Sequence, residues 1–425
     1  MLTLAMVGLP LVLLIAGMPI FLVLLGTSTV ILLFFLDVPP MIIHQQMFGS
    51  IGVFALLAVP FFIFAGEIML RGGVSARLLA WVSSMLGGVR GNLPLTALGT
   101  ATVFGAISGS TAATVAAVGT ITYKPLRNAG YSERFASGML TSAGAIANII
   151  PPSIAMILYG FATETSIIDL FAAGIIPGFL LAGVFGTYIY IHARRAQIGK
   201  GDPMSFARFV AASRDGLWAI GAPAIILGGI YSGIFSPTEA AGVACVYGIF
   251  VGMVVYREVN IRELFDIAAH SVYLTAQVFI IIAASGVYSW LLTVTGASAE
   301  AVNFISDLQM PAWAILLIIN IFLLAVGTVL DTVSAILVLT PLLADVALAV
   351  GVNPVHFGLI AILNLTIGTF TPPFGFNIFV AQAVFRVPLS SLYPGLLPFI
   401  LLAIGALLVI TYVPALSLWI LQFVG

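Results

Sequence analysis

The sequence predicts an all-α integral membrane protein built as an inverted repeat, in which each half contains a re-entrant helical hairpin and a broken helix. Of its 425 residues, 61% are hydrophobic and 7% are charged, and apolar runs of about 18 residues or more recur along the chain. Such runs predict helical spans and not the short alternating strands of a membrane barrel. Two Pro-Pro pairs, Pro151-Pro152 and Pro372-Pro373, interrupt apolar runs in which a membrane helix is normally continuous.

The positions of the charges predict the topology. Lys and Arg are confined to a few segments, which we expect to face the cytoplasm: Arg71 to Arg90, Lys124 to Arg134, Arg194 to Arg214, Arg257 and Arg262, and Arg386. The connections between them carry acids without bases and should face the outside: Asp37, Glu164, Asp169, Glu239, Glu300, Asp307 and Asp345. This assignment places the N-terminus outside.

The first repeat is predicted at about residues 1–170. The segment Leu2 to Ala16 lacks a basic n-region and a cleavage site, so we interpret it as a retained first span. Pro19 starts a second span, a third follows, and the amphipathic stretch after Gly72 is expected to lie along the membrane interface. A hairpin over 94–123, entering from the cytoplasm, and a broken helix over 136–170 complete the unit.

The second repeat is predicted at about 218–390. The Pro-Pro pairs are 372 − 151 = 221 residues apart, and the same offset aligns Ser110-Thr111 with Asp331-Thr332. It predicts a hairpin over 312–343, entering from outside, and a broken helix over 356–385. A connecting span in 171–217 inverts this unit relative to the first, and 391–425 supplies a final span, for about ten crossings in total.

The connecting region also contains the basic loop from His192 to Gly216. We interpret it as a linker with a surface helix. A lipid-headgroup or regulatory role is the alternative, although bases next to the membrane are already required by the orientation.

The helix breaks are candidate binding sites, because backbone groups that lose their helical partners must be satisfied by other groups. Carbonyl and hydroxyl oxygens there suit a hard cation, and the N-termini of half-helices favour a carboxylate. Close helix packing and a simple proline kink are the alternatives for any single motif. Four motifs at matched spacing in two halves favour a site.

Asp331 is the only carboxylate that the predicted topology places deep in the membrane. Direct cation binding, proton transfer and capping of the second hairpin helix are all open, and we favour capping with indirect support of an ion site. Glu67 precedes Arg71 by four residues, which predicts an interfacial salt bridge in preference to a proton relay.

Enzymatic activity is not expected. The segment around Ser108 faintly resembles an intramembrane serine protease, but Ala106 replaces the usual glycine and no histidine is placed as the base. His44, His192, His270 and His356 all lie near predicted span ends. The single cysteine, Cys245, forms neither a disulfide within the chain nor a metal cluster.

Four segments resemble the large membrane (M) subunit of TRAP transporters, the tripartite ATP-independent periplasmic family. They are GAISGSTAATVAAVGTI (105–121), NIIPPSIAMILYG (148–160), FSPTEAAGV (235–243) and GTFTPPFGFNIFVA (368–381). The resemblance implies an elevator-type carrier in the bacterial inner membrane, with a periplasmic N-terminus. It also implies import of an organic acid driven by a Na+ gradient, with sialic acid as the first expectation and a C4-dicarboxylate as the second.

The resemblance further implies two protein partners on separate chains: a periplasmic substrate-binding (P) protein and a small four-helix membrane (Q) subunit. The lipid bilayer is the remaining partner, and no nucleic acid is expected. A stand-alone Na+/dicarboxylate symporter of a related family is the alternative carrier, and a passive channel is the alternative of a different class.

The same resemblance assigns the site residues, and sodium is the only metal ion it implies. The sodium ligands are expected among Ser108, Gly109, Ser110, Asn148 and Pro151 for one ion, and Gly327, Asp331, Gly368, Thr369 and Thr371 for a second. The substrate is expected near Ser110, Thr111, Pro152, Ser153, Thr332, Ser334, Pro373 and Asn377. Because no Lys or Arg lies at the predicted midplane, bound sodium and helix termini must supply the positive field for an anion.

Overall fold

The computed structural model describes residues 2–36, 38–198 and 203–423, and in these ranges the chain forms helices and no β-strand. Six of the described helices are long and apolar enough to cross a membrane, or seven if the bent pair α11 (Phe206–Asp215) and α12 (Leu217–Tyr231) counts as one span. The protein is therefore an all-helical, multi-pass membrane protein. Asp37, one of the acids expected outside, lies beyond the described residues.

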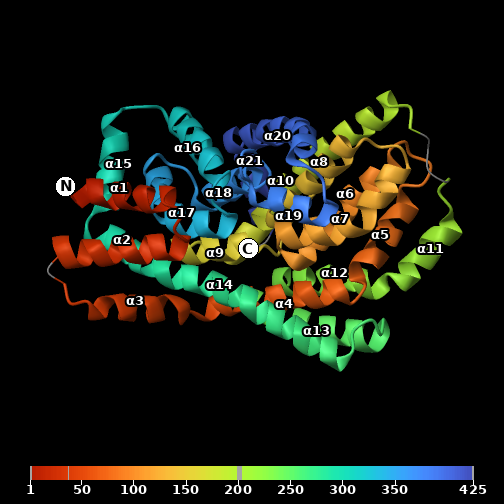
Figure 1. Cartoon of the computed structure of the whole chain (residues 1–425), viewed down its shortest axis with the longest axis horizontal. Coiled ribbons are helices and arrows are strands. Elements are labelled where there is room, and N and C mark those ends of the chain that lie inside the picture. Colours follow the sequence, from red (N-terminus) through yellow and green to blue (C-terminus); the bar gives the residue numbers. More distant parts are fainter. Residues whose placement is uncertain (1, 37, 199–202, 424–425) are drawn as a thin grey trace.

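The first repeat contains a hairpin and a broken helix, which follow five α-helices and precede one long helix, and Figure 1 labels these helices along the chain. Its elements are α1 (Leu2–Ile15), α2 (Ile20–Phe35), α3 (Met41–Ile51), η1 (Phe54–Leu57), α4 (Ala58–Arg71), α5 (Val74–Met85), the hairpin α6 (Asn92–Ser108) and α7 (Thr111–Asn128), the broken helix α8 (Glu133–Gly144), η2 (Ala145–Asn148) and α9 (Ile154–Thr163), and α10 (Ile167–Arg195).

The second repeat follows α11 in the same order, and it begins with α12, which packs on α13 as α1 packs on α2. Its further elements are α13 (Pro237–Phe250) with η3 (Val251–Val255), α14 (Ile261–Val294), α15 (Ala297–Asp307), the hairpin α16 (Ala312–Gly327) and α17 (Thr332–Ala349), the broken helix α18 (Pro354–Gly368) and α19 (Phe376–Phe385), α20 (Leu389–Tyr412), and the short α21 (Ala415–Leu418) and η4 (Trp419–Phe423).

The repeat extends further than the sequence analysis assigned. Helices α7 and α17 begin 332 − 111 = 221 residues apart, and α10 and α20 begin 389 − 167 = 222 residues apart. Helix α20 packs on α8 as α10 packs on α18, and α7 packs on α19 as α17 packs on α9. Helices α10 and α20 are therefore equivalent members of the two repeats, and not a connecting span and a separate C-terminal span.

Several boundaries also differ from the expected ones. The broken helix expected over 136–170 stops at Thr163, where Glu164 adopts a left-handed conformation with φ of 54°. Ser166 then caps α10, its hydroxyl accepting the N–H of Asp169 at 3.2 Å. The hairpins expected over 94–123 and 312–343 continue to Asn128 and Ala349.

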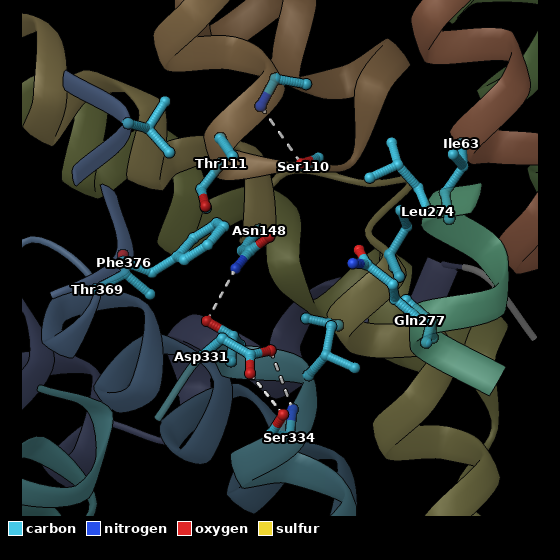
Figure 2. Close-up of a pocket in the computed structure, with 18 of the residues that line it drawn as sticks. Ile63, Ser110, Thr111, Asn148, Leu274, Gln277, Asp331, Ser334, Thr369 and Phe376 are labelled. Atoms are coloured by element: carbon cyan, nitrogen blue, oxygen red, sulfur yellow. Dashed lines mark hydrogen bonds between the residues drawn. The ribbon is translucent and has the colours of Figure 1, made fainter. Parts of the chain in front are cut away.

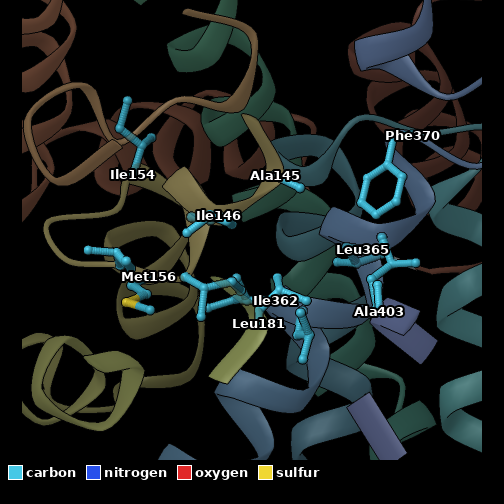
Figure 3. Close-up of a cluster of buried hydrophobic side chains, with 14 of the residues drawn as sticks. Ala145, Ile146, Ile154, Met156, Leu181, Ile362, Leu365, Phe370 and Ala403 are labelled. Atoms are coloured by element: carbon cyan, nitrogen blue, oxygen red, sulfur yellow. The ribbon is translucent and has the colours of Figure 1, made fainter. Parts of the chain in front are cut away.

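The two broken helices form one packed body. Figure 3 shows Ile146 beside the first break and Ile362 on α18 within one apolar cluster, together with Leu181 of α10 and Ala403 of α20. These four side chains are fully buried. In a membrane protein such close packing is what holds helices together, since lipid tails are as apolar as the side chains themselves.

A long helix borders this body on one side. Helix α14 has 34 residues, or about 51 Å at 1.5 Å per residue, and it extends along the lower edge of the molecule in Figure 1. It packs against α2, α3 and α4, and also against α17. At the 221-residue offset it corresponds to α3, η1 and α4 together, so the first repeat divides the same length of chain into separate helices.

Candidate functional site

A cavity of about 870 Å³ lies where the two hairpin tips meet the two helix breaks. Figure 2 shows Ser110, Thr111, Asn148 and Asp331 on one side of it, and Ile63 and Gln277 on the other. The opposite wall is made by α2, α4 and α14. The cavity is therefore bounded by the packed body on one side and by the surrounding spans on the other.

The first hairpin tip rests directly on the first break. Gly109 has φ of +57°, and a Cβ atom there would lie 2.8 Å from the carbonyl oxygen of Pro152. The Gly109 carbonyl in turn accepts the N–H of Ile154 at 3.4 Å. Only glycine satisfies both the left-handed backbone and this close approach.

The second hairpin repeats the contact with different residues. The N–H of Gly375 donates to the Thr328 carbonyl at 2.9 Å. Below the tip, a Cβ atom on Gly368 would lie 2.3 Å from the carbonyl carbon of Gly327. The backbones of α16 and α18 therefore touch with no side chain between them.

Hydrogen bonds between the repeats join the two half-sites. The Thr111 hydroxyl of the first hairpin donates to Asn377 Oδ1 in the second broken helix at 2.9 Å. In the opposite sense, Asn148 Nδ2 at the first break donates to Thr366 Oγ1 at 3.2 Å and, more weakly, to Thr332 Oγ1 of the second hairpin at 3.5 Å. Each hairpin tip is thus linked to the broken helix of the other repeat, which makes one composite site.

Four helix N-termini face the cavity: those of α7, α9, α17 and α19. Ser110 caps α7 and Ser153 caps α9, each hydroxyl accepting a backbone N–H at 3.4 Å. Among the described lining residues the charged side chains are Glu67 and Asp331, and none is Lys, Arg or His. The positive potential available to an anion therefore comes from backbone N–H groups and helix dipoles.

Asp331 caps α17 at the position equivalent to Ser110. Its Oδ2 accepts the N–H of Ser334 at 3.1 Å, and its Oδ1 accepts the Ser334 hydroxyl at 2.5 Å. Both carboxylate oxygens are thereby engaged within the hairpin. This is the capping role that the sequence analysis favoured.

The breaks leave carbonyl oxygens that suit a hard cation. Across the described chain, no hydrogen bond reaches the carbonyl oxygens of residues 149–152 at the first break or 370–372 at the second. Carbonyl and hydroxyl oxygens are the ligands that sodium takes at broken membrane helices. The described residues contain no group of three or more His, Cys, Asp and Glu that could hold a different metal ion.

The predicted site residues divide into two groups in the structure. Those that line the cavity are Ser108, Gly109, Ser110, Thr111, Asn148, Asp331, Thr332, Ser334 and Thr369. Those that are not among its lining residues are Pro151, Pro152, Ser153, Gly327, Gly368, Thr371, Pro373 and Asn377. Ser153 and Asn377 are fully buried.

The sequence analysis did not identify the opposite wall. Ile63, Glu67, Leu274 and Gln277 line it from α4 and α14, and Phe376 lines the cavity from the start of α19. In the sequence, only Gln277 could have indicated this wall, because it is an isolated amide in the apolar run YLTAQVFIII. Glu67 Oε2 lies 3.9 Å from Arg71 Nε, so the predicted ion pair is present.

The hydroxyl of Ser108 is bonded within the first hairpin. It lies 3.1 Å from the hydroxyl of Thr114 and accepts the N–H of Ser110 at 3.4 Å. The buried His356 is bonded to Ser417 and to the Thr411 carbonyl. The described contacts therefore give Ser108 no histidine base of the kind a serine protease needs.

Comparisons with known proteins agree with one another. The family model described as "Tripartite ATP-independent periplasmic transporter, DctM component" matches residues 7–416. The C4-dicarboxylate TRAP transporter large permease protein DctM of Pseudomonas aeruginosa is 38% identical over 380 residues, covering 89% of each chain. The isethionate TRAP transporter permease protein DctMQ of Oleidesulfovibrio alaskensis is 39% identical over 378 residues, covering 89% of this chain and 60% of that protein.

A solved structure shows the same fold. The YdaH transporter of Alcanivorax borkumensis, described as having an unusual topology, superimposes with a TM-score of 0.67 at 14% sequence identity. The alignment covers 97% of this chain and 98% of that one.

Proposed function

Since this chain belongs to the DctM-component family of the tripartite ATP-independent periplasmic transporters, we propose that it imports an organic acid across the bacterial inner membrane by sodium symport. The observation that carries the proposal is the cavity between the hairpin tips and the breaks. It brings four helix N-termini together next to the two breaks, where carbonyl oxygens are unbonded, and has no basic side chain among its described lining residues.

Sodium is a transported substrate in this scheme. We assign to it the unbonded carbonyls of residues 150–152 and 370–372, with the side-chain oxygen of Asn148, which lines the cavity. Bound cations then add the positive charge that the protein side chains lack, so substrate affinity depends on sodium. The substrate carboxylate binds between Ser110 and Thr332, at the N-termini of α7 and α17.

The moving part is the body formed by the hairpins, the broken helices, α10 and α20. The static part is the set of spans that includes α2, α4, α13 and α14. The cavity lies at their boundary, so the substrate site passes across the membrane with the body while the surrounding spans stay in place. In this topology the N-terminus is periplasmic.

A site whose positive potential comes only from helix N-termini and bound sodium best suits an acid with one carboxyl group. Sialic acid is therefore the first candidate and a C4-dicarboxylate the second. The names of two relatives, a C4-dicarboxylate permease and an isethionate permease, show that substrates differ among similar chains.

Two protein partners complete the proposal: a periplasmic substrate-binding protein and a small membrane subunit. The name of the isethionate relative joins M and Q, and this chain covers only 60% of its length. We propose that a small membrane (Q) subunit works together with this chain.

Transport assays in proteoliposomes test the proposal. The purified protein with its neighbouring small subunit and binding protein is given a panel of acids, under either a sodium gradient or a proton gradient without sodium. We expect saturable uptake only with sodium and the binding protein. Equal uptake in sodium-free buffer would refute sodium coupling, uptake without the binding protein would indicate a stand-alone symporter, and non-saturating flux would indicate a channel.

Variants locate the site in the same assay. Ser110→Ala and Asn148→Ala should weaken transport and sodium activation together. Thr120→Val is the matched control, since that exposed hydroxyl on α7 bonds only the Ala116 carbonyl of its own helix. Wild-type sodium activation in both site variants would overturn the assignment of the first sodium site.

A further inference from the structure

The static wall of the cavity carries a single charge. Its lining residues come from α2, α4 and α14, and they are Pro19, Ile20, Phe21, Ile63, Gly66, Glu67, Leu70, Leu274, Gln277, Val278, Ile280 and Ile281. Only Glu67 and Gln277 among them have polar side chains. Glu67 lies one helical turn after Ile63, which points into the cavity in Figure 2.

Glu67 is close to the first hairpin tip. The neighbouring Gly66 approaches so closely that a Cβ atom on it would lie 3.2 Å from the Cα of Ser108 and 3.6 Å from its carbonyl oxygen. One Cα step further along α4, the backbone of Glu67 is within about 8 Å of the tip. An acid on the static wall therefore lies beside the tip that we assign to the first sodium ion.

The charge of Glu67 is only partly compensated. The single ion-pair contact, Glu67 Oε2 to Arg71 Nε, is 3.9 Å long, and the Arg71 side chain is 46% exposed. The Glu67 side chain is only 14% exposed, so the weak compensation follows from the length of the contact and from the exposure of the Arg71 partner. Arg71 is not among the residues that line the cavity, whereas Glu67 is.

We propose that Glu67 is a positioning residue for sodium that acts in one end state of the transport cycle only. Its carboxylate raises sodium affinity at the first hairpin tip while the tip lies against Gly66. When the body moves, the tip leaves Glu67 behind on the static wall, and this contribution is lost. The inference rests on the proposed sodium coupling. It predicts that the first hairpin tip binds sodium with different affinity in the two end states.

The expected size follows from Coulomb's law. If the carboxylate lies as far from the ion as the Glu67 backbone lies from the tip, about 8 Å, its unit charge changes cation affinity by about twofold in a water-like medium and about thirtyfold at an effective dielectric constant of 20. A cavity open to water lies between these limits. The effect should be measurable without abolishing transport.

The test compares Glu67→Gln with Arg71→Gln, which change the local charge in opposite directions. Asp345→Asn is the matched control, since it removes one acid at an exposed position of α17 that does not line the cavity. Sodium binding is measured by calorimetry on purified protein. Sodium activation is then measured separately from each face of oriented proteoliposomes.

We expect E67Q to weaken sodium activation at one face only, and R71Q to strengthen it at that face. D345N should match the wild type at both faces. An unchanged E67Q protein, or an equal shift at both faces, would overturn the inference. If E67Q does not fold, the change in sodium affinity of R71Q still tests the inference. Stronger sodium binding by R71Q supports the electrostatic role of Glu67, whereas weaker binding shows that the pair is structural and overturns it.

The two proposals fail in distinguishable ways. A wild-type protein without sodium activation contradicts the proposed function. A sodium-activated wild type whose E67Q variant is indistinguishable from it contradicts only the role of Glu67.

Discussion

Replacing Gly368 by Ala tests whether the close contact between α16 and α18 supports the second half of the site. In this substitution two effects oppose each other. Alanine is favoured over glycine in a helix by about 1 kcal/mol, so propensity alone predicts a more stable protein. The added Cβ atom, however, would lie 2.3 Å from the Gly327 carbonyl carbon and 2.4 Å from its Cα.

The steric effect should win. Carbon atoms in contact need about 3.5 Å, so α16 and α18 must separate by about 1.2 Å. The obstacle is backbone and cannot rotate away, and overpacking of this kind costs about 1–3 kcal/mol. Metal-ligand distances tolerate only about 0.2 Å, so a shift of this size should also weaken sodium binding near Thr369.

Thermal unfolding and sodium activation of transport measure the two consequences. We expect Gly368→Ala to lower the unfolding temperature and to raise the sodium concentration that gives half-maximal uptake. Gly405→Ala on α20 is the control, because a Cβ atom there meets nothing within 4 Å. A G368A protein that is as stable and as sodium-sensitive as G405A would refute the reasoning.

Three further substitutions probe the polar contacts of the site. Asn148→Asp removes both hydrogen-bond donors that link the first break to the second repeat, so transport should fall and sodium activation should change, as measured by uptake against sodium concentration. Thr111→Val leaves the buried Asn377 amide without its hydroxyl donor, which should lower the free energy of unfolding by about 1–3 kcal/mol. Asp331→Ala removes the cap of α17 and the bond to Ser334, which should cost about 0.5–2 kcal/mol of stability.

For each of these three predictions, one outcome would contradict it. Wild-type transport by Asn148→Asp would show that its amide donors do not hold the half-sites together. If Thr111→Val unfolds as the wild type does, the cross-repeat bond contributes nothing net. If Asp331→Ala has the same free energy of unfolding as Asp331→Asn, which keeps an oxygen for the cap, the cap contributes nothing net to stability.

The sequence was sufficient to predict the local features of the site. Ser110 and Asp331 were aligned by the 221-residue offset, and both prove to be N-caps at hairpin tips. Such caps depend only on residues close together in the sequence, because a short polar side chain before an apolar run accepts hydrogen bonds from the first N–H groups of its own helix. The predicted boundaries were less accurate: Glu164 ends α9 and Ser166 caps α10 inside the stretch that was expected to be one broken helix.

The pairing across the repeats was not predictable in the same way. Thr111 and Asn377 are 266 residues apart, and Asn148 and Thr332 are 184 apart. Hydrophobic periodicity reports which residues are buried, but it does not report which buried residue faces which. That depends on the angles and depths at which helices from the two halves pack.

For this protein, composition, charge placement and the repeated Pro-Pro motif were enough to establish a helical membrane protein with two related halves and broken helices at its functional centre. The tertiary structure determined the rest: that α10 and α20 belong to the repeat, that four helix N-termini meet around one cavity, and that Glu67 and Gln277 line it from α4 and α14. The physical reason is that helix breaks and caps are local, whereas a cavity between helices distant in the sequence exists only once those helices have packed.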